Sequence, residues 1–126
     1  MMERCPEIED LVHRLFGALS VGDMKAVEEL FINGDELVVV GTDPNEWWVG
    51  RGAVIAALNA QVIALGGLPI KADNPTGWRI GDVAWVSDVP VMGGFTKFRL
   101  TGTAMLEDTW RFVQMHLSIP DPRVHP

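Results

Sequence analysis

The chain is poor in basic residues and in cysteine, and these shortages bound what it can do. Lys and Arg number 10 against 17 Asp and Glu, which gives a net charge of −7. No basic cluster is present to meet phosphate groups, so nucleic-acid binding and attachment to an anionic membrane surface are disfavoured. The single cysteine, Cys5, excludes an internal disulfide.

The chain also lacks the apolar segments that direct proteins into or across a membrane. Its first ten residues, MMERCPEIED, are too polar for a signal peptide. No apolar run approaches the roughly 18 residues that a membrane-spanning helix needs. We therefore expect a cytoplasmic protein with no membrane partner.

The composition that remains is typical of one globular domain. The chain has 126 residues, of which 48% are hydrophobic. A chain of this length buries about 65–70% of the surface that it exposes when unfolded. No repeat or linker divides it, so we expect a single domain over residues 1–126. Its core is expected over about 7–120, followed by a frayed tail over 121–126.

Hydrophobic periodicity predicts helices early in the chain and antiparallel strands late. Apolar residues recur at helical spacing from Glu7 to Leu19, and Asp23 is placed to cap a second helix. A third helix is predicted over 53–65. Runs rich in β-branched and aromatic residues predict extended segments over 37–42, 69–80, 83–91, 95–106 and 110–119. This order indicates the α+β fold class.

The last strand, which begins at Trp110, is predicted to be the centre of the sheet. Strict alternation gives two sides: Trp110, Phe112, Gln114, His116 and Ser118 on one, and Arg111, Val113, Met115 and Leu117 on the other. Both sides carry apolar residues, which is typical of a strand that is covered on both faces. We expect helices on one face, and the other face to be covered either within the chain or by a second subunit.

Three segments carry a family resemblance: Ser20–Leu30 (SVGDMKAVEEL), Gly81–Val86 (GDVAWV) and Trp110–Pro120 (WRFVQMHLSIP). With the order of elements, they resemble the SnoaL-like families of the nuclear-transport-factor-2-like superfamily. The resemblance implies a cone-shaped α+β barrel, in which a curved, mostly antiparallel sheet wraps three N-terminal helices. It also implies a pocket at the open end and a homodimer formed through the outer face of the sheet.

The resemblance leaves the function open between catalysis and binding, because one fold hosts many functions. Members include ketosteroid isomerase, polyketide cyclases and dehydratases, which imply a cofactor-independent enzyme acting on a small hydrophobic molecule. Other members, such as the association domain of calcium/calmodulin-dependent kinase II, imply a noncatalytic ligand-binding or dimerisation module. Neither alternative requires a cofactor.

The best candidate for a general base is Asp43, which follows a predicted strand in the step Asp43-Pro44. This step resembles the Asp-Pro step that carries the base of ketosteroid isomerase. Burial beside Trp47 and Trp48 would raise the pKa of the carboxyl group towards the working range. The alternative is an aspartate that only caps a turn before proline.

The sequence contains no tyrosine, and this absence bears on the chemistry. Ketosteroid isomerase stabilises its oxyanion with a tyrosine and a protonated aspartate. Isomerisation of that kind is therefore disfavoured here. His116 is a second catalytic candidate, as an acid–base partner of a carboxylate. Its alternative is an outer-face residue at the seam of a dimer.

The remaining site candidates depend on which face of the last strand lines the pocket. If Val113, Met115 and Leu117 face the helices, strand pairing is expected to bring Arg99, Thr101, Thr103, Trp85 and Ser87 beside them. Asp88, opposite Trp85, is then expected on the outer surface. The ligand-binding candidates are Trp47, Trp48, Trp85, Ser87, Arg99, Thr101, Met115 and Leu117. The alternatives are tryptophans that pack in the core and a solvated or salt-bridged Arg99. No metal site is expected, because the three histidines lack ligand spacing.

Overall fold

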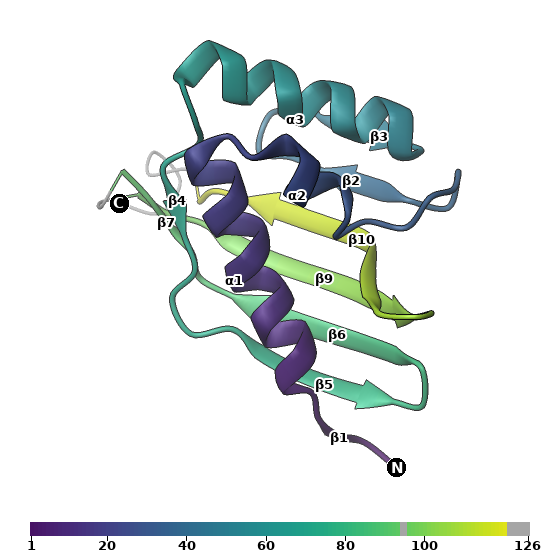
Figure 1. The fold of residues 1–126 in the computed structure, drawn as a ribbon. Coiled ribbons are helices and arrows are strands. Elements are labelled where there is room, and N and C mark those ends of the chain that lie inside the picture. The colour runs from purple at the N-terminus through teal and green to yellow at the C-terminus, as the bar shows by residue number, and fades with distance from the viewer. Residues whose placement is uncertain (94–95, 121–126) are drawn as a thin grey trace.

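An open, mixed sheet carries the helices on one of its faces in the computed structural model, which describes residues 1–93 and 96–120 (Figure 1). The sheet has 7 strands and is not closed into a barrel. The α+β class and the three helices are as predicted from the sequence. The expected tail over 121–126, and the Gly94 and Phe95 positions of a predicted hairpin, lie outside the described residues.

The helices begin and end where the sequence places capping residues. α1 (Pro6–Val21) starts at a proline, and the residue that follows its last turn is Gly22, which has a φ of 75° in the left-handed region. α2 (Met24–Glu28) is capped as predicted, because the Asp23 side chain accepts a hydrogen bond from the Ala26 N–H at 3.2 Å. α3 (Arg51–Leu65) lies beside β2 and β3, at the edge of the fold opposite to β1 (Figure 1).

Strands from both ends of the chain meet in the main sheet. In spatial order they are β1 (Glu3–Arg4), β5 (Thr76–Ile80), β6 (Val83–Asp88), β9 (Arg99–Leu106), β10 (Trp110–Ser118), β2 (Val38–Val40) and β3 (Trp47–Val49). A second sheet has 3 short strands: β4 (Ile70–Lys71), β7 (Val91–Met92) and β8 (Thr96–Lys97). The predicted segment 69–80 is thus split between two sheets.

The prediction that the last strand is central is confirmed. β10 lies between β9, to which it is antiparallel, and β2, to which it is parallel. The predicted alternation along β10 is wrong in its first half, because one extra residue, Val113, interrupts the pairing between Phe112 and Gln114. Such a bulge turns the following side chains to the other face. Phe112 and Met115 are therefore both buried on the helix side.

The expected set of neighbours on this face is also wrong. Met115 pairs with Gly102 and Leu117 with Leu100, so both face the helices as predicted, but with neighbours other than those expected. The outer face instead carries His116 paired with Thr101, and Ser118 paired with Arg99. Through β9, Trp85 and Ser87 of β6 join that outer face.

α1 crosses the helix-side face of the sheet and is fastened to it near its N-terminus (Figure 1). The Glu9 carboxylate accepts a hydrogen bond from the Gly77 N–H at 2.8 Å and pairs with Arg4 at 2.6 Å. The helix approaches so closely that a Cβ at position 77 would lie 2.4 Å from Cγ2 of Ile8. Glycine is therefore required there for the contact between α1 and β5.

Asp88 corrects a second expectation from the sequence. It was expected on the outer surface, but its residue surface is only 7% exposed, on the side of the sheet opposite Trp85. Its two carboxylate oxygens accept hydrogen bonds from the backbone N–H groups of Asp73 and Asn74, at 3.1 and 3.0 Å. A buried carboxylate is tolerated there because both of its oxygens are satisfied.

Candidate functional site

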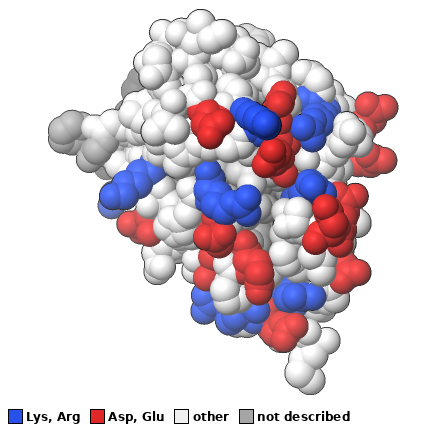
Figure 2. Space-filling view, viewed as in Figure 1, with Lys and Arg blue, Asp and Glu red and all other residues white. Residues whose placement is uncertain are grey.

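A hollow at the C-terminal end of α3 combines apolar walls with a small polar cluster. Its volume is about 300 Å³, at the lower end of the range for small-molecule sites. We call it the α3 pocket, and it is lined by Thr42, Glu46, Gln61, Ala64, Leu65, Leu68, Met92 and Phe98. These residues come from the β2–β3 turn, from α3 and the segment after it, and from β7 and the residue before β9. The outer surface of α3 is largely white in Figure 2, and Glu46 is the one charged residue among those that line the pocket.

The polar cluster is centred on the carboxylate of Glu46. One oxygen, Oε2, accepts a hydrogen bond from Nε2 of Gln61 at 2.8 Å. The other, Oε1, accepts from the Asp43 N–H at 2.9 Å and from the Thr42 hydroxyl at 3.4 Å. These contacts from both sides of the pocket fix the orientation of the carboxylate. It can accept a further hydrogen bond, because an ionised carboxylate has about four acceptor positions.

The β2–β3 turn is shaped to bring Glu46 to this position. The Gly41 N–H donates to the Glu46 carbonyl at 2.7 Å, which closes the turn. A Cβ at position 41 would lie 2.6 Å from Oε1 of Glu46, so glycine leaves the space that the carboxylate occupies. Glu46 is partly buried, whereas Asp43 and Pro44 are exposed.

Asp43, the base predicted from the sequence, lies in this turn and does not line the pocket. Its Oδ1 accepts a hydrogen bond from the Asn45 N–H at 3.0 Å, and its carbonyl accepts one from the Glu46 N–H at 2.9 Å. Both contacts close the turn, as expected for an aspartate that caps a turn before proline. Asp43 therefore contributes by holding the turn that carries Glu46.

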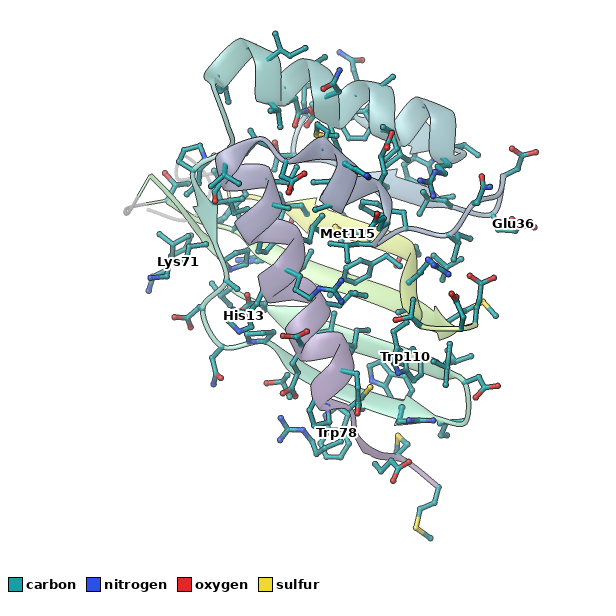
Figure 3. The ribbon with its side chains drawn as sticks, viewed as in Figure 1. His13, Glu36, Lys71, Trp78, Trp110 and Met115 are labelled. Atoms are coloured by element: carbon teal, nitrogen blue, oxygen red, sulfur yellow. The ribbon has the colours of Figure 1, made fainter. Side chains whose placement is uncertain are left out.

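The sheet separates the other predicted site residues into two groups. Trp48, Met115 and Leu117 are on the helix side, where Met115 is buried beneath the helices (Figure 3). The outer face carries the rest of the set: Trp47, Trp85, Ser87, Arg99, Thr101 and His116. His116 thus lies on the outer face, as in its second alternative, and does not line the α3 pocket. The structure does not bring the predicted residues together at one site.

The sequence reasoning missed Glu46 and Gln61. A signal for Gln61 was present, because it lies three residues after Leu58 and four before Leu65, on the flank of the apolar face of α3. A polar residue at that position indicates a polar partner nearby. Glu46 had no comparable signal, since its role depends on the turn that precedes Trp47.

The part of the chain that the structure describes contains neither a metal-binding group of side chains nor a membrane-spanning helix. Residues 1–93 and 96–120 contain no group of three or more His, Cys, Asp or Glu side chains arranged to hold a metal ion. None of the helices in these ranges is long and apolar enough to cross a membrane.

Comparison with known proteins gives a family and a fold. The SnoaL-like domain family matches residues 8–122. None of the curated proteins matches the sequence.

Several solved structures share the fold. A protein of unknown function from the DUF3225 family of Pectobacterium atrosepticum has 23% identity and a TM-score of 0.76, covering 92% of this chain and 90% of that chain. An NTF2-like protein of unknown function from Pseudomonas putida has 18% identity and a TM-score of 0.76, covering 96% and 90%. A cystatin-like fold protein from Burkholderia xenovorans has 20% identity and a TM-score of 0.73, covering 94% and 97%.

The cone-like arrangement expected from the resemblance agrees with these neighbours, although at such identities they show the fold alone. The family match, by contrast, extends over nearly the whole sequence. The protein belongs to the SnoaL-like domain family.

Proposed function

We propose that the protein binds a small hydrophobic molecule in the α3 pocket and that Glu46 recognises the polar end of that molecule. The observation that carries this proposal is the carboxylate of Glu46, held by Gln61 at 2.8 Å within a hollow walled by Leu65, Leu68, Met92 and Phe98. Apolar walls supply affinity, and a few oriented polar groups supply specificity.

The charge of the pocket selects the chemistry of the ligand. An ionised carboxylate accepts hydrogen bonds and repels anions, so the ligand needs a donor such as a hydroxyl or an amine. The net charge of −7 adds to the repulsion of anionic molecules. The ligand class that fits is therefore an uncharged or cationic molecule with an apolar body and one donor group.

If the protein is an enzyme, Glu46 is the base that we propose, in place of Asp43. A base must reach the proton that it removes, and Glu46 lines the pocket whereas Asp43 does not. Gln61 would then act as a positioning residue that holds the carboxylate. If the protein is a noncatalytic binding module, the same pocket binds the same class of ligand without turnover.

Chemical-shift mapping with a panel of small alcohols, amines, ketones, lactones and carboxylates tests the proposal. We expect saturable shifts at Gln61, Leu68 and Phe98 with the alcohols and amines. Glu46→Gln should weaken their binding at least about tenfold, because it replaces a charged acceptor by a neutral amide. Asp43→Asn, three residues away and outside the pocket, is the matched control and should change Kd less than about threefold. Shifts that map elsewhere, or an equal loss in both variants, would contradict the proposal.

A second proposal concerns the outer face of the sheet, where we infer a homodimer. Apolar side chains gather there on three adjacent strands: Trp78, Ile80, Val83, Trp85 and Met105, which are 36–49% exposed. Register places Trp78 opposite Trp85, and Ile80 and Met105 on either side of Val83. A contiguous apolar patch of this kind is typical of a protein–protein interface.

Light scattering coupled to gel filtration tests the dimer. Trp85→Lys is expected to shift the mass from dimer towards monomer, because it places a charge in the centre of the patch. Ile63→Lys is the control, since Ile63 is 73% exposed on α3, away from this face. A wild-type monomer at about 100 µM, a concentration well above the Kd of standard-sized interfaces, would refute the proposal.

A further inference from the structure

A second hollow lies at the opposite end of the sheet from the α3 pocket. Its volume is about 330 Å³, and it is lined by Glu29, Phe31, Asn33, Arg51, Glu107 and Arg111. It shares none of these residues with the α3 pocket. β9 joins the two ends with 8 residues, which places them about 25 Å apart along the strand. We call this hollow the arginine site.

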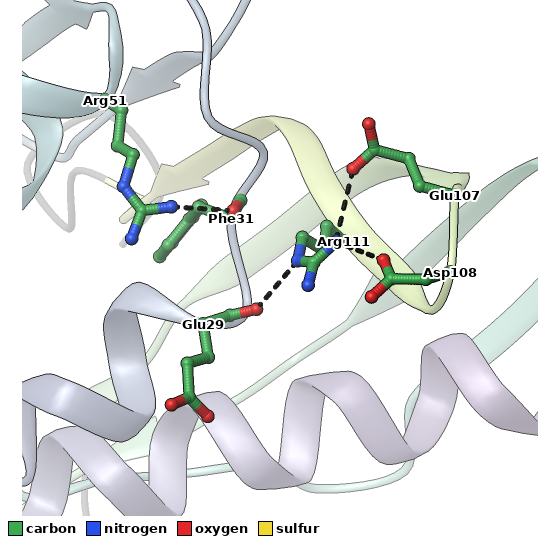
Figure 4. A network of polar contacts seen from close by, with 6 residues as sticks. All are labelled: Glu29, Phe31, Arg51, Glu107, Asp108 and Arg111. Atoms are coloured by element: carbon green, nitrogen blue, oxygen red, sulfur yellow. Dashed lines mark hydrogen bonds and ion pairs between the residues drawn. The ribbon is translucent and has the colours of Figure 1, made fainter.

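One of its two arginines, Arg111, is fixed on several sides (Figure 4). Its Nε donates to the Glu29 carbonyl at 3.2 Å, and its Nη1 contacts the carboxylates of Asp108 at 2.6 Å and Glu107 at 3.3 Å. The hydrogen bond from Arg111 lowers the pKa of the Asp108 carboxyl group, and the reciprocal contact raises the pKa of Arg111. The charge of Arg111 is thus balanced within the fold.

The other arginine, Arg51, is anchored differently. Its Nη1 donates to the Phe31 carbonyl at 3.2 Å. Within residues 1–93 and 96–120, its guanidinium group has no ion pair. The Glu29 carboxylate points away from both arginines in Figure 4. Because a guanidinium group carries five donors in a fixed fork, one bond to Phe31 orients Arg51 and leaves donors for a ligand.

The charges around the arginine site limit the ligand to a single negative charge. Arg51 and Arg111 are matched in number by Glu29 and Glu107, and Asp108 adds one more negative charge beside Arg111. A dianion would meet two carboxylates on the Arg111 side. A monoanion needs only the charge of Arg51, and a planar carboxylate matches the geometry of the fork.

We propose that the arginine site binds a small carboxylate, whose oxygens contact the free donors of Arg51 beside the side chain of Asn33. This is a binding site separate from the α3 pocket, and it takes the opposite class of ligand. Arg111 acts as a positioning residue, because it holds the 29–31 segment whose Phe31 carbonyl orients Arg51. The local charge balance predicts weak binding, in the millimolar range, of the simplest carboxylates.

Titration of the full chain with sodium acetate, at ionic strength kept constant with sodium chloride, tests this proposal. The readout is the two-dimensional NMR spectrum of backbone amides and of arginine Nε–H groups. We expect saturable shifts at Asn33, Arg51 and Arg111. Arg51→Gln should raise the Kd for acetate at least about fivefold, and Arg51→Lys, which keeps the charge but not the fork, about threefold. Arg14→Gln on α1 is the matched control and should stay within about twofold of wild type.

Two further titrations, one with sulfate and one of the Glu46→Gln variant, distinguish the carboxylate site from its alternatives. Sulfate at the same ionic strength should bind no more tightly than acetate, because its second charge is opposed by Glu107 and Asp108. Glu46→Gln should leave acetate binding unchanged, so failure of the α3 pocket proposal is distinguishable from failure of this one. Shifts that follow chloride as well as acetate, tighter binding of sulfate, or either Arg51 variant within about twofold of wild type would overturn the carboxylate site.

Discussion

The buried carboxylate of Asp88 gives the most quantitative prediction about this fold. Asp88 ends β6 and holds the segment before β5 through the N–H groups of Asp73 and Asn74, at 3.1 and 3.0 Å. A hydrogen bond to a charged acceptor contributes about 1.5–3 kcal/mol, and removal of the carboxylate also relieves its desolvation. We therefore expect Asp88→Ala to lower the free energy of unfolding by about 3 kcal/mol. Asp88→Asn, which keeps one acceptor and turns an N–H group towards the other donor, should cost about 1–2 kcal/mol.

Thermal and urea unfolding of the two variants measure this effect. For a domain of this size, about 3 kcal/mol corresponds to a fall in Tm of roughly 10 °C. Asp73→Ala is the matched control, because it removes an exposed side chain from the same segment and leaves its N–H in place. It should stay within about 0.5 kcal/mol of wild type. A loss below about 0.5 kcal/mol in Asp88→Ala would refute the claim that Asp88 holds this segment.

Three smaller predictions follow from the N-terminal contacts. Burial raises the pKa of the Cys5 thiol, so it should react with a disulfide reagent only on unfolding; fast labelling of the native protein would contradict this. The hydrogen bonds from Arg4 and the Gly77 N–H lower the pKa of Glu9 below 4.5, so Glu9→Gln should cost about 0.5–1 kcal/mol above about pH 4.5. That cost should shrink as the pH falls through the folded-state pKa, and a cost that does not change with pH would exclude the ionic origin. Gly77→Ala places a methyl group against Ile8 and should lower the stability by about 1–3 kcal/mol in urea unfolding, whereas Gly52→Ala, with open space around it, should not.

The elements of this fold could be predicted because their signals are local. Helical spacing over 7–19, the cap at Asp23 and the apolar run from Trp110 each depend on neighbours within a few residues. The central position of β10 could also be inferred, since a strand with apolar residues on both faces has to be covered on both.

The register could not be predicted, because it depends on one bulged residue. Val113 is the extra residue between Phe112 and Gln114, and no Gly or Pro marks the position. Alternation counted through it assigns Trp110 and Phe112 to the outer face, although both are buried on the helix side. Figure 3 shows Trp110 on that side. The same miscount placed Thr101 and Arg99 beside Met115.

The candidate site could be predicted only in part, because it depends on how α3 packs against the β2–β3 turn. The turn with Asp43 was identified, but the pocket contains the next acidic residue, Glu46, because the turn folds back and directs that side chain towards α3. Gln61 is 15 residues away in the sequence, and only the packing of α3 against the turn brings the two side chains together. The position of Gln61 on α3 gave a signal of its own, but its pairing with Glu46 leaves no pattern in a single sequence.

The most direct test of the central claim is a comparison of two ligands with one carbon skeleton, cyclohexylmethanol and cyclohexanecarboxylate. Their Kd values at the α3 pocket, measured by NMR titration from the shift at Phe98, isolate the charge of the polar end. Our account predicts that the alcohol binds at least about tenfold more tightly than the carboxylate, which is about 1.4 kcal/mol, and that Glu46→Gln removes this preference. Equal affinities in the wild type, or a preference that survives in Glu46→Gln, would contradict the account.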